Sequence, residues 1–326
     1  VRIVYNNMLL TIVIVFLTFL FLRLSYKRHQ LNKRLKGFAS PPGYPLFGHL
    51  FMLTSKLGRI PNLIEASRKY GGYLKLELFF GVPFLVITDK EFISRVINGY
   101  PLLVKDAMYD LTDKWLGDSI VVSKPEKWKK IRKIVTPAFS VQSLENYVKL
   151  LDAPCKTLID GLKKELSGEA FDILPYMIPC TLEIITASIM GIKLDAQNNK
   201  DLDYISDSEE ISSITLRRIF NPFKQFFITY VWTRDFWNER VTAARIRKFT
   251  MEVINRRRRM RSKNIDKDIR GCLLDTLLDA EYDGKPLTDK QIMDEVQTFV
   301  AMIQPPPALV SVFIAYHNMV MHRITF

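Results

Sequence analysis

Cysteine and histidine are scarce in this sequence, which has three cysteines and four histidines among 326 residues. Cys155, Cys180 and Cys272 are far apart and form no CxxC pair, so we expect neither a disulfide scaffold nor a zinc cluster. Unpaired cysteines are typical of a reducing, cytosol-facing location. Hydrophobic residues make up 48% of the chain and charged residues 25%, which excludes a wholly disordered chain, a collagen and a polytopic transporter.

Acidic residues are outnumbered, with 34 Asp and Glu against 47 Lys and Arg, and the formal net charge is +13. Such a charge suits nucleic acid, an acidic protein or an anionic membrane surface. Two basic blocks stand out, at residues 23–36 and 256–263. Neither block alternates with aromatic residues as a single-strand binder requires, so we expect no nucleic-acid partner.

The longest uncharged apolar run is Met8–Leu22. With its apolar neighbours it reaches about 20 residues, the length that spans a bilayer. Basic residues from Arg23 onward follow it, which predicts that the rest of the chain stays cytosolic. A cleaved signal peptide carries its basic residues before the run, and a helix packed on a core has a polar face that this run lacks. We therefore predict a membrane anchor over residues 1–25. The first residue is Val and not Met, which leaves open whether the native chain begins before Val1.

A basic, proline-rich linker is predicted over residues 26–48, because the prolines of Pro41–Pro45 exclude a helix. The body, residues 49–326, is predicted to be mainly α with one small β-sheet, an α+β arrangement. Thr288 and Gln291 form a capping box that opens a long helix. The other main elements expected are strands over residues 73–78 and 84–88 and helices over residues 62–70, 89–98, 181–191, 238–263 and 268–282.

One predicted helix, residues 126–139, places an arginine on its apolar face. At 100° per residue, Arg132 shares a face with Trp128, Ile131, Val135 and Phe139. A buried guanidinium requires an anion, because an unpaired buried charge is costly. The sequence leaves two sources open, an acidic side chain from a distant segment or the carboxylate of a bound ligand.

The segment Trp128-x-x-x-Arg132, followed by Thr136–Phe139, resembles helix C of the cytochrome P-450 (haem-thiolate) monooxygenases. Three other segments are similar to the family's hinge, its helix E and the start of its helix I, namely residues 41–48, 182–194 and 287–300. Their order and spacing also agree with the family, nearest the fatty-acid ω-hydroxylase branch. The chain resembles only the N-terminal part of the family's catalytic domain, and it ends just after helix I.

This resemblance implies a haem b cofactor, with Trp128 and Arg132 hydrogen-bonded to a haem propionate. It also implies a pocket for a lipophilic small molecule, although ordinary core packing is an open alternative for its first four residues. The implied pocket residues are Met108, Leu111, Trp115, Leu116 and Phe299. The segment Phe220–Phe227 is similar to the family's membrane-facing entrance.

Several family features are missing from this sequence. No cysteine loop for the axial iron ligand occurs, and we interpret all three cysteines as structural, so no metal ligand is predicted. The family's oxygen-activating acid and threonines align with Pro305, Pro306 and Pro307, and a haem-linked glutamate aligns with Met302. No catalytic residue is therefore intact. We expect a fragment, a mis-spliced product or a pseudogene product.

The same prolines bear on the last helix, because three consecutive prolines remove donors and bias the preceding residues to extended backbone. We predict that this helix begins at Thr288 or Asp289 and stops or kinks near Ile303 or Gln304. A second apolar helix is expected over residues 308–322.

The functional expectation is a monooxygenase of the endoplasmic reticulum membrane that hydroxylates a fatty acid, hormone-like lipid or xenobiotic. It would use O2 and electrons from an NADPH-cytochrome reductase. The lysines of residues 127–133 suit an acidic reductase, or they form a solvated helix face. Two alternatives stay open: an inactive, haem-free fragment or pseudoenzyme with a membrane-tethered binding role, and a basic helical adaptor on an anionic membrane. Whether this chain itself is an enzyme is not decided by the sequence.

Overall fold

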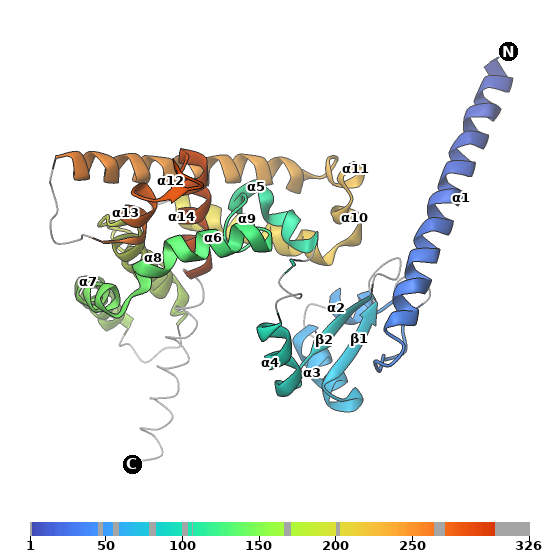
Figure 1. Ribbon diagram of the computed structural model, residues 1–326, viewed down its shortest axis with the longest axis horizontal. Helices are drawn as coiled ribbons and strands as arrows, with labels where there is room; N and C mark the ends of the chain where they lie inside the picture. The colour runs from blue at the N-terminus through green and yellow to red at the C-terminus, as the bar shows by residue number, and fades with distance from the viewer. Residues whose placement is uncertain are drawn as a thin grey trace. The chain divides into compact units, whose positions relative to one another are not determined.

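The computed structural model describes residues 2–44, 48–54, 59–77, 83–99, 104–105, 107–165, 171–199, 203–263 and 271–303 (Figure 1). They form a mainly helical chain, as expected, with two small antiparallel sheets where the sequence predicted one. The chain separates into two compact units, residues 1–102 with 220–222, and residues 103–219 with 223–326. The predicted division at residues 25 and 48 stays a prediction.

The first unit contains a two-stranded sheet flanked by helices. Strand β1 (Tyr73–Glu77) pairs with β2 (Pro83–Ile87), with Tyr73 opposite Ile87. Leu74 and Leu76 are fully buried, as the alternating pattern predicts. The helices of this unit are α1 (Arg2–Arg34), α2 (Leu50–Thr54), α3 (Arg59–Tyr70) and α4 (Lys90–Asn98).

Helix α4 begins and ends where its sequence signals lie. The carboxylate of Asp89 accepts a hydrogen bond from the backbone N–H of Phe92 at 2.8 Å, so Asp89 is the N-cap of this helix. Gly99 occupies the C-cap. Helix α1 contains the apolar run that the sequence predicts to be a membrane anchor. None of the helices in the described part of the chain was found to have both the length and the hydropathy of a membrane span.

The second unit is built around α8 (Leu174–Met190), which packs against α7 (Val141–Leu162) and contacts three more helices: α12 (Arg234–Ser262), α13 (Leu273–Leu278) and α14 (Asp289–Ile303). Leu182 and Met190 of α8 are fully buried, as expected for a helix that is apolar on all sides. The remaining elements are η3 (Ala107–Thr112), α5 (Asp113–Leu116), α6 (Pro125–Val135), η4 (Thr136–Phe139), η5 (Lys163–Glu165), α9 (Asp203–Phe220), α10 (Pro222–Gln225) and α11 (Phe227–Tyr230).

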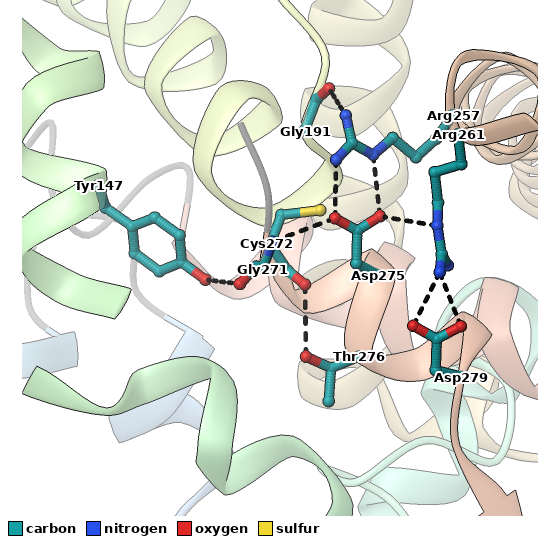
Figure 2. Close-up of polar contacts among 9 residues, drawn as sticks. All are labelled: Tyr147, Gly191, Arg257, Arg261, Gly271, Cys272, Asp275, Thr276 and Asp279. Atoms are coloured by element: carbon teal, nitrogen blue, oxygen red, sulfur yellow. Dashed lines mark hydrogen bonds and ion pairs between the residues drawn. The ribbon is translucent and has the colours of Figure 1, made fainter. Parts of the chain in front are cut away.

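A buried ion pair joins three of these helices (Figure 2). Arg257 of α12 donates Nε–H and Nη2–H to the two carboxylate oxygens of Asp275 of α13, at 2.9 and 2.7 Å. Its Nη1 donates to the carbonyl of Gly191, the residue that ends α8, at 2.9 Å. Arg257 is 2% exposed, so its position in the basic block 256–263 does not make it a surface charge.

The predicted helix over residues 268–282 is wrong in its C-terminal part. The helix α13 ends at Leu278, and Glu281–Tyr282 forms a strand, β3, paired with β4 (Lys285–Pro286). Between them Asp283 and Gly284 have φ values of 52° and 74°. Asp-Gly accommodates two positive φ values, and such a turn joins antiparallel strands in a tight hairpin.

Helix α14 begins at Asp289 with the predicted capping box. The N–H of Thr288 donates to Oε1 of Gln291 at 2.9 Å, and the N–H of Gln291 donates back to Oγ1 of Thr288 at 3.3 Å. The last described residue of this helix is Ile303. Pro305–Pro307 and the second helix expected over residues 308–322 lie outside the described residues.

Candidate functional site

Helix α6 carries the two residues that the sequence assigns to a ligand carboxylate. Pro125 occupies its first turn, and Ile131 and Val135 anchor it in the core with 0% and 4% exposure. Trp128 is half-buried and Arg132 is exposed. The guanidinium carbon of Arg132 lies 5.2 Å from the centroid of the Trp128 ring, a cation–π distance. The two side chains therefore form one unit on the surface of α6.

The expectation that Arg132 lies inside a buried face is wrong. The buried stripe of α6 is centred on Ile131 and Val135, and Arg132 lies about 100° and 60° from them around the helix. Phe139 is also 37% exposed, because the α-helix gives way to the 3-10 turn η4 before it. The exposed guanidinium of Arg132 therefore does not require an anionic partner.

Two lysines of α6 form ion pairs with acidic side chains, whereas Arg132 does not pair with a described carboxylate. Lys127 forms an ion pair with Asp118 at 2.9 Å, and Lys130 one with Asp283 at 2.6 Å. Among the described residues no carboxylate pairs with Arg132, so its guanidinium fork can accept an external anion. An exposed, aromatic-backed arginine fits the propionate that the resemblance implies.

The five predicted pocket residues fall into three groups. Met108 and Leu111 of η3 are half-buried. Trp115 and Leu116 of α5 belong to the main core, with 5% and 1% exposure, as ordinary packing predicts. Phe299 of α14 is partly buried, and its ring centroid lies 5.6 Å from that of Phe139. The structure thus brings Phe299 to the C-terminal end of the α6–η4 segment.

The three cysteines do not fit an axial iron ligand. Burial raises the pKa values of Cys180 and Cys272 to about 12, so both thiols are neutral near pH 7. Cys155 lies on α7, and the Cys180 thiol contacts the carbonyl oxygen of Pro154 at 3.6 Å. The described residues therefore fit the propionate end of a haem and not its iron.

Sequence analysis missed two buried carboxylates on α14. Asp294 and Glu295 are 2% and 1% exposed. Each accepts a hydrogen bond from a backbone N–H of the loop between α5 and α6, Asp294 from Asp118 and Glu295 from Ile120. The sequence signal that could have indicated these buried carboxylates was a pair of adjacent acids in a helix that is otherwise mostly apolar.

Comparison with known proteins shows the family to which the chain belongs. The family model for cytochrome P-450 matches residues 39–301. Cytochrome P-450 4d10 of Drosophila mettleri is 32% identical over 291 residues, covering 86% of this chain and 56% of that protein. Human cytochrome P-450 4V2 is 29% identical over 272 residues, covering 79% of this chain and 52% of the relative. The chain belongs to the cytochrome P-450 family, whose cofactor is haem.

A solved structure supports the fold independently. A crystal structure of a mutant cytochrome P-450 haem domain superposes with a TM-score of 0.68 at 19% identity, covering 88% of this chain and 62% of that domain. This match confirms the cytochrome P-450 fold. The chain spans about half the length of the curated relatives described above.

Proposed function

We propose that this chain corresponds to the N-terminal part of a membrane-bound haem-thiolate monooxygenase that hydroxylates a lipophilic substrate with O2. The observation that carries the proposal is the exposed guanidinium of Arg132, stacked on Trp128 and unpaired with any described carboxylate. Family membership supports haem as the group it binds. Fatty acids are the favoured substrates, because the closest resemblance in the sequence is to the ω-hydroxylase branch.

In this proposal α6 holds one end of the cofactor. Arg132 supplies a planar pair of N–H donors for a propionate, and the half-buried Trp128 ring fixes the orientation of that guanidinium. When bound, haem supplies the oxygen-activating chemistry. Phe299, with Phe139 beside it, supplies apolar surface that would orient a lipophilic substrate and exclude water.

A lipid bilayer is the proposed location, at the cytosolic face of the endoplasmic reticulum. Support comes from the uncharged run Met8–Leu22 and from a second apolar surface on α10, α11 and the start of α12. The most exposed residues of this surface, 51–86% accessible, are Phe223, Phe226, Phe227, Ile228, Trp232 and Trp237. An apolar patch of this kind, rich in aromatics, is typical of contact with the membrane interface.

An NADPH-cytochrome reductase is the proposed electron donor. Lys127 and Lys130 are engaged with Asp118 and Asp283, which leaves Lys129 and Lys133 as the exposed lysines of α6 without an ion pair to a described residue. These two charges suit an acidic partner, and the interaction would weaken with salt.

A second candidate function is a haem-free, membrane-tethered binding role. The neutral, buried thiols of Cys180 and Cys272 favour it, because they offer no thiolate to iron.

Haem titration of the purified chain separates the two candidates. We expect saturable binding with a Soret band, and a reduced, carbon monoxide-bound form without the thiolate band. Arg132→Gln should weaken binding by about tenfold, since a charge-assisted hydrogen bond contributes about 1.5–3 kcal/mol. Lys129→Gln, on the same helix, is the matched control and should bind like wild type. Equal affinities of the two variants would disprove the propionate role, and no binding by wild type would favour the second candidate.

A further inference from the structure

The loop between α5 and α6, residues 117–124, packs against two carboxylates of α14. Glu295 is 1% exposed, and its Oε2 accepts a hydrogen bond from the backbone N–H of Ile120 at 3.1 Å. Asp294 is 2% exposed, and its Oδ2 accepts one from the backbone N–H of Asp118 at 3.3 Å. Two successive acids of one helix thus hold two alternate residues of one loop.

Gly117, the first residue of this loop, is shaped for the contact. Its φ is +60°, which disfavours any residue with a side chain. A Cβ at this position would also lie 2.2 Å from Cγ of Asp294. The loop can approach the Asp294 carboxylate only because residue 117 is glycine.

The start of the loop is also tied to the helix of the candidate site. Nζ of Lys127 contacts Oδ2 of Asp118 at 2.9 Å and also donates to the carbonyl of Asp118. Lys127 directly precedes Trp128 on α6. Contacts therefore run from Asp294 through Asp118 to Lys127, at the start of the segment that carries Trp128, and Glu295 holds Ile120 of the same loop.

We propose that Glu295, together with Asp294, is a positioning residue that fixes the loop 117–124 and, through it, the ends of α5 and α6. Its consequence for haem and substrate rests on the function proposed above. Neither carboxylate touches a reacting group in this assignment. Both act through the backbone of the loop.

The charges around Glu295 make this contact sensitive to pH. Burial raises the pKa of Glu295 to about 7, and the N–H of Ile120 and the charge of Lys127 oppose this shift. The carboxylates of Asp294 and Asp118 raise the pKa further. A second lysine, on α14 itself, pairs with Asp294 at 3.1 Å.

The direction of the pH effect follows from linkage. Burial beneath the loop accounts for the raised pKa, so the closed loop binds the Glu295 proton more tightly than an open, hydrated loop with an ordinary pKa of 4.5. Raising the pH through 7 therefore favours opening. Between pH 6 and pH 8 the opening equilibrium should increase by about tenfold.

Hydrogen exchange of the whole 326-residue chain tests the proposal. Exchange of peptides that cover residues 117–124 is measured at pH 6 and pH 8 and corrected for the intrinsic rate. Wild type should lose about tenfold protection at pH 8. Glu295→Gln should abolish this pH dependence, whereas Glu252→Gln, at an exposed position of α12, should retain it. Glu295→Asp, whose shorter side chain draws the carboxylate away from Ile120, should lower protection at both pH values.

Two results would overturn the inference. The first is a wild-type loop whose protection from hydrogen exchange does not change with pH, a result that needs no variant. The second is a Glu295→Gln variant whose protection depends on pH as that of the wild type does. Haem titration of the same samples separates this inference from the proposed function. If exchange behaves as expected and no haem binds, loop positioning stands and the proposed function fails. If haem binds and exchange shows no dependence on Glu295, only the positioning role fails.

Discussion

The guanidinium of Arg257 lies directly over the backbone of Gly191 (Figure 2). Gly191 ends α8 with φ +64°, and a Cβ on it would lie 2.7 Å from Cζ of Arg257. The same guanidinium makes a bidentate ion pair with the carboxylate of Asp275. Nε of Arg261 lies 3.7 Å from Oδ1 of the same carboxylate. The end of α8, the C-terminal part of the basic helix α12 and the start of α13 are therefore joined by one buried charge.

Substituting Gly191 by alanine should destabilise the chain for two reasons. A left-handed residue other than glycine costs about 1–2 kcal/mol, and the new methyl group would also displace Arg257 from its carbonyl acceptor. We expect Gly191→Ala to lower the free energy of unfolding by more than ~2 kcal/mol in urea denaturation. Gly284→Ala is the matched control, because Gly284 has φ +74° and nothing within 4 Å of a Cβ. Equal losses for the two variants would mean that the close approach to Arg257 is unimportant.

Removing one partner of the buried pair should cost more than removing both. Arg257→Met leaves the buried Asp275 carboxylate without its bidentate partner, and breaking such pairs costs about 3–5 kcal/mol. The double variant Arg257→Met with Asp275→Leu should recover part of this loss. Lys156→Met provides the surface comparison: its pair with Asp152 is more than 70% exposed, so a much smaller change is expected. Urea denaturation of the four proteins measures all three differences.

Membrane contact should come from two separate parts of the chain. Deleting residues 1–25 should lower retention on vesicles of phosphatidylcholine and phosphatidylserine, and the exposed aromatic surface of α10–α12 should preserve some binding. Adding Phe227→Ser and Trp232→Ser to the deletion should reduce that remainder further, since these side chains are 64% and 86% exposed. Val148→Ser on α7, at 66% exposure, is the control. Full recovery of the intact chain in solution without detergent would contradict the anchor.

Local patterns predicted the elements whose signals are complete within a few residues. Leu74 and Leu76 alternate with polar residues and are buried, and Thr288 with Gln291 caps α14. The hairpin at Asp283 was missed because apolar residues continue at helical spacing from Leu274 through Leu278 to Tyr282, and this pattern obscured the Asp-Gly turn signal.

The candidate site was predicted less completely, for a different reason. A helical wheel gives the angles between Ile131, Val135 and Arg132, but it does not show which side of the helix packs against the core. In the structure the buried side is centred on Ile131 and Val135, and Arg132 lies outside it. The contact between Glu295 and Ile120 joins residues 175 positions apart. No local sequence pattern predicts a contact over this separation. The packing of the loop against Asp294 and Glu295 of α14 is therefore known only from the structure.

The buried Glu295 should make stability fall as the pH rises from about 4.5 to about 7. Burial raises its folded-state pKa to about 7, so the folded chain binds this proton more tightly than the unfolded chain does. The stability linked to it is complete below the unfolded pKa and is lost as the pH passes through the folded pKa. Glu295→Gln removes this proton from the linkage, so relative to wild type it should gain ~1–3 kcal/mol on going from pH 5 to pH 8. Urea denaturation of both proteins across this range measures the difference. A constant difference between them would show that Glu295 titrates alike in the folded and unfolded chains.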